Sequence, residues 1–177
     1  MRQEEDRAVA LLQKYGISKP PVPVEEIATG EGVVIVRRHF DGTESGFTLR
    51  DGVQIIIGIN TRTHRRRQRF SIAHEIGHVI LHPFNPLIVD HAVRVDWRDD
   101  VSSLGTDAQE IEANAFGAAL LMPQAMVIDH VKSYAAKSHL LEAGLSRNEL
   151  ISELVREFDV SAEAMGFRLI NLGILAG

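Results

Sequence analysis

The spacing of apolar residues predicts helices at both ends of the chain. Residues 3–15 carry apolar side chains at helical intervals, and this pattern ends at Gly16. The proline-rich connector at residues 20–23 is expected to begin a short helix that continues through Ala28. Three further segments in the second half of the chain are predicted to be helices: Gln124–Ala136, Arg147–Glu157 and Ala162–Asn171.

Between the N-terminal helices and the middle of the chain, the pattern changes to that of strands. The segments rich in β-branched residues are Val33–Phe40, Gly46–Leu49 and Val53–Ile59. The last two are separated by Arg50-Asp51-Gly52, and an Asp-Gly pair between apolar runs is typical of a tight hairpin. A short strand is also expected at Ala92–Trp97. The mixture of strands and helices predicts an α+β fold.

Apolar residues between Phe70 and Leu81 predict a buried helix, which is expected to run from about Thr63 to His82 and to end before Pro83. It contains the H-E-x-x-H pattern His74-Glu75-Ile76-Gly77-His78. On a helix, the two histidines lie one turn apart on one face and can reach the same Zn²⁺, with Glu75 beside them. The alternative is a pair of core histidines with local hydrogen bonds, but such a group is costly to bury without a partner. One Zn²⁺ per chain is therefore the expected cofactor.

The next helical segment supplies candidates for the third ligand that a tetrahedral zinc site needs. It begins with a capping-box pattern at Thr106–Gln109 and continues to Met122. One stripe of this helix holds Glu110, Asn114, Gly117 and Leu121. Because Gly117 would allow another helix to approach closely, Glu110 is the expected ligand. Glu112 is the alternative, on a second stripe with Ala115 and Ala119 that is interpreted as the more exposed face.

Other polar residues near the motif leave alternatives open. Asn114 could orient a ligand or satisfy a neighbouring helix backbone. His82 could approach the site, but its place at the helix C-terminus favours a capping role. A basic cluster precedes the H-E-x-x-H motif and consists of Arg62, Arg65, Arg66, Arg67 and Arg69. It is predicted to be a solvated face, with docking of an acidic partner as the alternative. Of these arginines, Arg67, two turns before His74, is the one expected to face the cleft. The remaining histidines, His39, His64, His91, His130 and His139, have no ligand spacing and are expected in surface or packing positions.

Together the two motifs resemble those of the ImmA/IrrE type of metallopeptidase. The resemblance rests on His74–His78 with its Arg-Phe-Ser-Ile-Ala lead-in, and on Glu110–Phe116 followed by Leu-Leu-Met-Pro. Gly117 departs from the alanine that the family often has. The resemblance implies a minimal zincin-like domain, in which a small twisted sheet packs on the H-E-x-x-H helix and C-terminal helices are added. It also implies a cytoplasmic endopeptidase that cuts a separately encoded helix-turn-helix repressor of mobile-element or stress-response genes.

Zinc chemistry gives the expected mechanism for this zinc metallo-endopeptidase. Zn²⁺ lowers the pKa of its water and polarises the scissile carbonyl, while Glu75 accepts the proton as general base. The chain has no G-x-S-x-G pattern and no cysteine, so the usual signatures of a covalent nucleophile are missing.

Composition limits the other function classes. A chain of 177 residues with 45% hydrophobic content can form one domain over 1–177, with a zincin-like core at 1–139 and a C-terminal helical pair at 140–177. No segment is apolar enough to predict a membrane span. The net charge of −5 gives no sign of general nucleic-acid binding. The alternative function is a DNA-binding or protein-interaction module with a structural or degenerate metal site, because the turn at Phe158–Ser161 has helix-turn-helix character. The three arginines and six acids of residues 140–177 argue against contact with phosphates.

Overall fold

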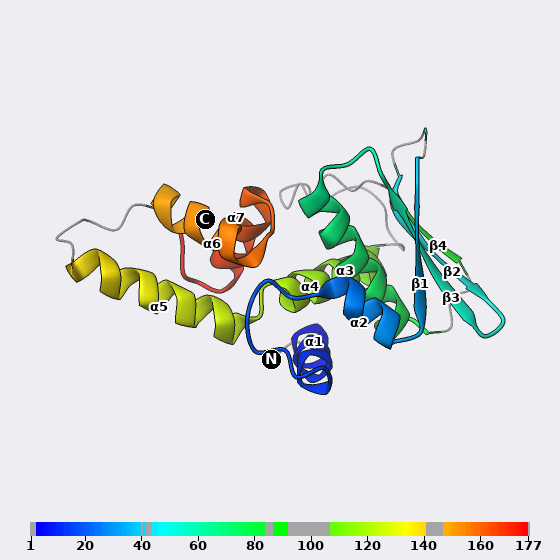
Figure 1. Ribbon diagram of the computed structural model, residues 1–177, viewed down its shortest axis with the longest axis horizontal. Coiled ribbons are helices and arrows are strands. Elements are labelled where there is room, and N and C mark those ends of the chain that lie inside the picture. The colour runs from blue at the N-terminus through cyan, green and yellow to red at the C-terminus, as the bar shows by residue number, and fades with distance from the viewer. Residues whose placement is uncertain are drawn as a thin grey trace.

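The computed structural model describes residues 3–39, 41, 44–83, 87–91, 107–140 and 147–176. The elements in this part of the chain are α1 (Gln3–Lys14), α2 (Val24–Gly30), β1 (Val33–Arg38), β2 (Glu44–Asp51), β3 (Gln54–Asn60), α3 (Arg65–Leu81), β4 (Leu87–His91), α4 (Asp107–Leu121), α5 (Gln124–Leu140), α6 (Arg147–Phe158) and α7 (Ala162–Asn171). A small sheet lies at one end of the molecule and helices make up the rest (Figure 1). The predicted α+β class is confirmed.

The sheet has the strand order β1-β3-β2-β4. Strand β3 pairs in parallel with β1 and antiparallel with β2, and β2 also pairs antiparallel with β4. The predicted hairpin is present, but Asp51 pairs with Gln54, so its two-residue turn is Gly52-Val53. The shift has a physical reason, because Gly52 has a φ of +60° and glycine adopts that conformation most easily. The fourth strand, β4, precedes the expected strand Ala92–Trp97, which lies outside the described residues.

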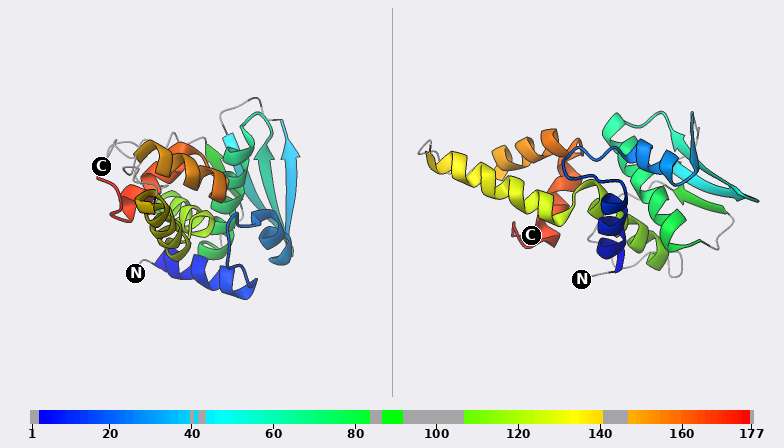
Figure 2. Two further views of the ribbon diagram at one scale, coloured as in Figure 1. Left: turned by 60° about the vertical axis from the view of Figure 1, so that its left-hand side comes forward. Right: turned by 60° about the horizontal axis from the view of Figure 1, so that its bottom comes forward.

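Helix α3 packs between the sheet and α4 (Figure 1, Figure 2). Two glycines allow α3 and α4 to approach closely. A Cβ added at Gly77 would lie 3.1 Å from Ala113 Cα, and one added at Gly117 would lie 3.1 Å from the backbone nitrogen of His74. The expected role of Gly117 is therefore confirmed. The expected exposure of Ala119 is wrong, since only 1% of it is exposed and α1 also packs against α4.

The C-terminal helices are joined to the N-terminal part of the chain by buried contacts. One cluster of buried residues contains Leu12 of α1, Ile72 of α3, Phe158 of α6 and Leu169 of α7. Arg168 of α7 donates hydrogen bonds to the Met122 carbonyl oxygen at 2.9 Å and to Glu5 Oε1 at 2.6 Å. The three predicted helices of this region are present, and α5 extends beyond Ala136 to Leu140.

Helix α5 reaches away from the sheet (Figure 1). Within the described residues, no single helix has the length and apolar character needed to cross a bilayer. One bent pair, Ala108–Leu121 with Gln124–Ala136, meets that test by length and composition only.

The basic cluster at the start of α3 differs from its prediction. Arg65, Arg66 and Arg69 all pair with Asp159, at N–O distances of 2.6, 3.3 and 3.2 Å. Arg69 is only 12% exposed and also donates to the Val22 carbonyl oxygen at 2.9 Å. These three arginines therefore join α3 to the turn between α6 and α7 and do not form a simple solvated face. Arg62 and Arg67 are exposed.

Candidate metal centre

His74 and His78 lie one turn apart in the buried middle of α3, as the H-E-x-x-H spacing predicts. Their Nε2 atoms are 3.0 Å apart. Burial lowers the pKa of His78, and the neighbouring His74 ring adds to that effect, although hydrogen bonding to Glu110 opposes it. A neutral imidazole presents a nitrogen lone pair, which is the form that binds metal ions.

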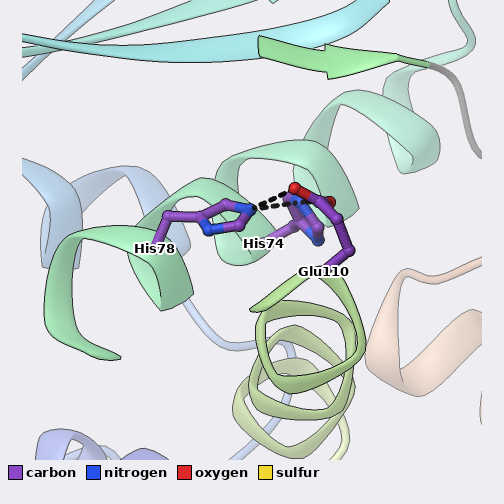
Figure 3. Close-up of side chains that lie close together, drawn as sticks. All are labelled: His74, His78 and Glu110. Atoms are coloured by element: carbon purple, nitrogen blue, oxygen red, sulfur yellow. Dashed lines mark hydrogen bonds and ion pairs between the residues drawn. The ribbon is translucent and has the colours of Figure 1, made fainter. Parts of the chain in front are cut away.

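Glu110, in the first turn of α4, faces both rings (Figure 3). Its Oε2 lies 3.2 Å from His74 Nε2 and its Oε1 lies 3.2 Å from His78 Nε2. Burial alone would raise the pKa of Glu110, but hydrogen bonds and charge interactions with the two imidazoles lower it to about 2. The group is therefore a carboxylate at neutral pH.

These three side chains fit a divalent cation. One donor atom from each of His74, His78 and Glu110 lies within 4.8 Å of the others. Two imidazole nitrogens and one carboxylate oxygen form the donor set of many catalytic zinc sites, which leave a fourth position open. When the His74 Nδ1 proton is directed to Asn114 Oδ1, a neutral His74 turns its Nε2 lone pair toward Glu110 Oε2, so two acceptor atoms face each other at 3.2 Å. A cation between them satisfies both.

Helix α4 also places the other two candidate polar residues. Asn114 Oδ1 lies 3.0 Å from His74 Nδ1, so the amide orients the ring whose other nitrogen faces Glu110. Glu112 does not join the cluster, and its Oε2 lies 3.6 Å from His82 Nε2. Of the two acids, the structure therefore brings only Glu110 to His74 and His78.

His82 occupies the C-cap position of α3, as the sequence predicts. Its Nε2 lies 3.2 Å from the Gln109 carbonyl oxygen in the first turn of α4. The ring centres of His78 and His82 are 5.4 Å apart. His82 therefore lies close to the cluster but joins the end of α3 to the start of α4.

Glu75 points from α3 toward the sheet and is completely buried. Its Oε2 accepts a hydrogen bond of 2.5 Å from Thr48 Oγ1 on β2. Sequence reasoning did not identify Thr48. It also missed Arg50, whose Nη2 donates to the carbonyl oxygens of His78 and His82 at 3.3 Å each. In the sequence, Thr48 and Arg50 are two positions apart, which on a strand places them on the same face. That spacing does not show which helix packs against this face.

The described histidines outside the cluster agree with the surface and packing positions expected for them. His64 is the N-cap of α3, and its side chain accepts a hydrogen bond from the Arg66 backbone N–H. The His130 ring packs edge-on against Phe158. His39 is exposed beside Asp41. The side chains of His91 and His139 lie outside the described part.

The structure thus combines a helix that carries an H-E-x-x-H motif, an acidic residue that faces its two histidines, and a small sheet packed on the same helix. This combination is typical of a zincin-like site. Residues 28–170 match the family model Peptidase_M78, described as the IrrE N-terminal-like domain. The chain therefore belongs to the M78 peptidase family, of the ImmA/IrrE type, and this membership supports a metallopeptidase.

Two relatives place this family match in context. The chain is 26% identical over 117 residues to the "uncharacterized immunity region protein 2" of Bacillus phage phi105, an alignment that covers 66% of each chain. A solved structure of a Mycobacterium tuberculosis transcriptional regulator matches with a TM-score of 0.59 and 18% identity. That match covers 96% of this chain but 47% of the regulator, so this likeness concerns the fold alone.

Proposed function

We propose that this protein is a zinc-dependent endopeptidase that cleaves a separately encoded helix-turn-helix repressor. The observation that carries the peptidase assignment is the convergence of His74, His78 and Glu110 in a chain of the M78 peptidase family. Glu75 follows His74 directly in the sequence. The three side chains are the proposed ligands of one Zn²⁺ per chain. The proposed setting is the cytoplasm, in keeping with a sequence that lacks cysteine.

The residues of the site have distinct tasks in this proposal. A zinc ion held by them would supply Lewis-acid chemistry, acidifying water and polarising a scissile carbonyl. Glu75 takes the proton from the attacking water and donates it to the leaving amine. Asn114 keeps His74 in the tautomer whose Nε2 lone pair faces the cluster.

The repressor is the more specific part of the proposal. It is supported by membership of the ImmA/IrrE-type family and by the similarity to a phage protein named for an immunity region. Strand β4 lies at the edge of the sheet beside β2, and an edge strand can hold an extended peptide by main-chain pairing. An exposed extended segment of the repressor is therefore the proposed cleavage site.

A DNA-binding role for α6 and α7 has less support. Arg168 of α7 is buried against Glu5 and the Met122 carbonyl oxygen and does not face solvent. Arg156 of α6 pairs with Glu153 on the same helix. These contacts leave little positive charge on the described pair to bind phosphates.

The test is to incubate the zinc-loaded protein with the helix-turn-helix repressor encoded beside its gene. Wild-type protein should yield discrete fragments. Glu75→Gln should keep its zinc but lose roughly 10²–10⁴-fold in rate, because an amide cannot accept the proton. Mass spectrometry of the fragments gives the cleaved bond, and casein is the control substrate.

Two results would contradict the proposal. If Glu75→Gln cleaves at the wild-type rate, Glu75 has no role as general base. If casein is degraded at many sites while the repressor stays intact, the protein is a general peptidase and the regulatory substrate is wrong.

A further inference from the structure

The face of β2 that is turned toward α3 carries three different residues at alternate positions. Residues 46, 48 and 50 share one face, because successive side chains of a strand point to opposite sides. These positions hold glycine, threonine and arginine. All three lie against the helix that carries the H-E-x-x-H motif.

Thr48 makes the closest of these contacts. Both Thr48 and Glu75 are completely buried, and the hydroxyl donates to Glu75 Oε2 at 2.5 Å. A short hydrogen bond from a hydroxyl to a carboxylate is charge-assisted and stronger than a neutral one. It also fixes which way the carboxylate plane is turned.

Gly46 leaves space for the other oxygen of the same carboxylate. A Cβ added at Gly46 would lie 3.0 Å from Glu75 Oε1 and 2.9 Å from the Gly58 carbonyl oxygen. A side chain at this position would therefore push on the carboxylate or on the neighbouring strand. The hydroxyl on one side and the missing side chain on the other define a single place for Glu75.

Arg50 holds the end of the same helix. Its Nη2 donates to the carbonyl oxygens of His78, Val79 and His82 at 3.2–3.3 Å, in the last turn of α3. A guanidinium at a helix C-terminus meets the negative end of the helix dipole, and here it adds to the bond that the His78 carbonyl oxygen already accepts from the His82 backbone N–H at 3.0 Å. Strand β2 therefore contacts α3 at two positions along the helix axis, at Glu75 and at the C-terminal end.

We propose that Thr48 is a positioning residue, which holds the Glu75 carboxylate in the orientation needed for proton transfer. This inference rests on the proposed function, because it gives Glu75 the role of general base. Thr48 does not touch substrate in this scheme. It acts through Glu75, so its loss should lower kcat more than it raises KM.

The catalytic test compares Thr48→Val, Thr48→Ser and wild type on the repressor substrate. Valine keeps the shape of threonine but cannot donate, so kcat should fall roughly 10- to 100-fold with little change in KM. Serine retains the hydroxyl and should recover most of the rate. Zinc content should stay at one per chain in all three. Thr29→Val is the matched control, because the Thr29 hydroxyl bonds to the Glu25 carbonyl oxygen on an exposed helix, and this variant should keep the wild-type kcat.

A second measurement does not depend on activity. In the otherwise wild-type protein, Thr48→Val should lower the melting temperature by roughly 3–10 °C, because it removes the hydrogen-bond donor of a buried carboxylate. In a Glu75→Ala background, the same replacement should cause less than half of that loss. This double-mutant cycle measures the coupling between the two side chains.

The outcomes separate this inference from the proposed function. A Thr48→Val protein with wild-type kcat overturns the positioning role, as does a rate that serine fails to restore. Equal melting shifts in the two backgrounds also overturn it. If wild-type protein cleaves no repressor, the proposed function fails, and the melting cycle still decides whether Thr48 holds Glu75.

Discussion

Glu110 remains ionised because of its neighbours, although it lies in a largely enclosed position. The two imidazoles that face it lower its pKa to about 2, against the effect of burial. Glu112, two residues later, lies beside His82 and is nearly half exposed. Two acids in one helical turn therefore have very different environments, and this difference predicts different effects of replacing them.

We predict that Glu110→Ala loses most of its zinc, whereas Glu112→Ala retains about one zinc per chain. The first replacement removes one of three proposed ligands, and the second removes a side chain that lies outside the cluster. Metal content after dialysis, measured by mass spectrometry, checks both. Retention of zinc by Glu110→Ala together with its loss from Glu112→Ala would assign the third ligand to the other acid.

The residues of the cluster could be predicted because their spacing follows from helix geometry. His74 and His78 are four positions apart, and the stripe that contains Glu110 also contains Asn114 and Gly117. Thr48 and Arg50 could not be predicted in the same way. Their roles depend on which face of β2 meets α3, and that depends on the packing of a sheet on a helix.

At the level of elements, the α3–α4 contact determines the site, because two proposed ligands lie on α3 and the third on α4. The helices approach closely at Gly77 and Gly117. Gly77 has Ala113 Cα, the Ala113 carbonyl oxygen and Phe116 Cδ1 at 3.1–3.2 Å from an added Cβ. Two of these three atoms belong to the α4 backbone, which cannot move without moving the helix.

We predict that Gly77→Ala lowers the free energy of unfolding by about 1–3 kcal/mol, because overpacking outweighs the helix propensity of alanine. Zinc affinity should fall as well, since α4 carries Glu110. The matched control is Gly166→Ala on α7, where an added Cβ meets nothing within 4 Å. That variant should gain about 0.5–1 kcal/mol.

Urea unfolding and competition with a zinc chelator measure the two effects. If Gly77→Ala is stabilised as much as Gly166→Ala, then α4 moves aside at little cost, and close packing does not position Glu110.

Most helix bounds were predictable because turn and capping residues mark them. The helix at Ala162–Asn171 was predicted with the observed bounds, and its N-cap, Ser161, accepts a hydrogen bond from the Ala164 nitrogen. β4 was not predicted, because its five residues, Leu87–His91, include two charged or titratable ones and show no clear alternation. Its place in the sheet comes from pairing with β2.

Across the whole molecule, Asp159 joins distant parts of the chain. It lies in the turn between α6 and α7 with a φ of +52°, and it pairs with three arginines at the start of α3. The partners are about 90 positions apart in sequence. No local pattern could have paired them, which is why the arginines were expected to form a solvated face.

We predict that Asp159→Asn lowers the free energy of unfolding by about 1–3 kcal/mol. Asparagine tolerates a positive φ, so the replacement tests the charge and not the backbone. Glu153→Gln is the matched control, because it breaks the pair with the exposed Arg156 and should cost less than about 1 kcal/mol. Urea unfolding gives both values, and equal losses would mean that the Asp159 cluster contributes no more than a surface pair.

The division of the ligands between two helices has a consequence for the abundance of the protein. An ion held by α3 and α4 binds only when the two helices are packed together, so it would favour the folded chain by mass action. Above the dissociation constant, each tenfold fall in free ion would remove about 1.4 kcal/mol of that stabilisation. Unfolded chains are degraded in cells, so the number of copies would follow the supply of the ion. Metal scarcity would then reduce the amount of peptidase as well as the fraction of it that is loaded.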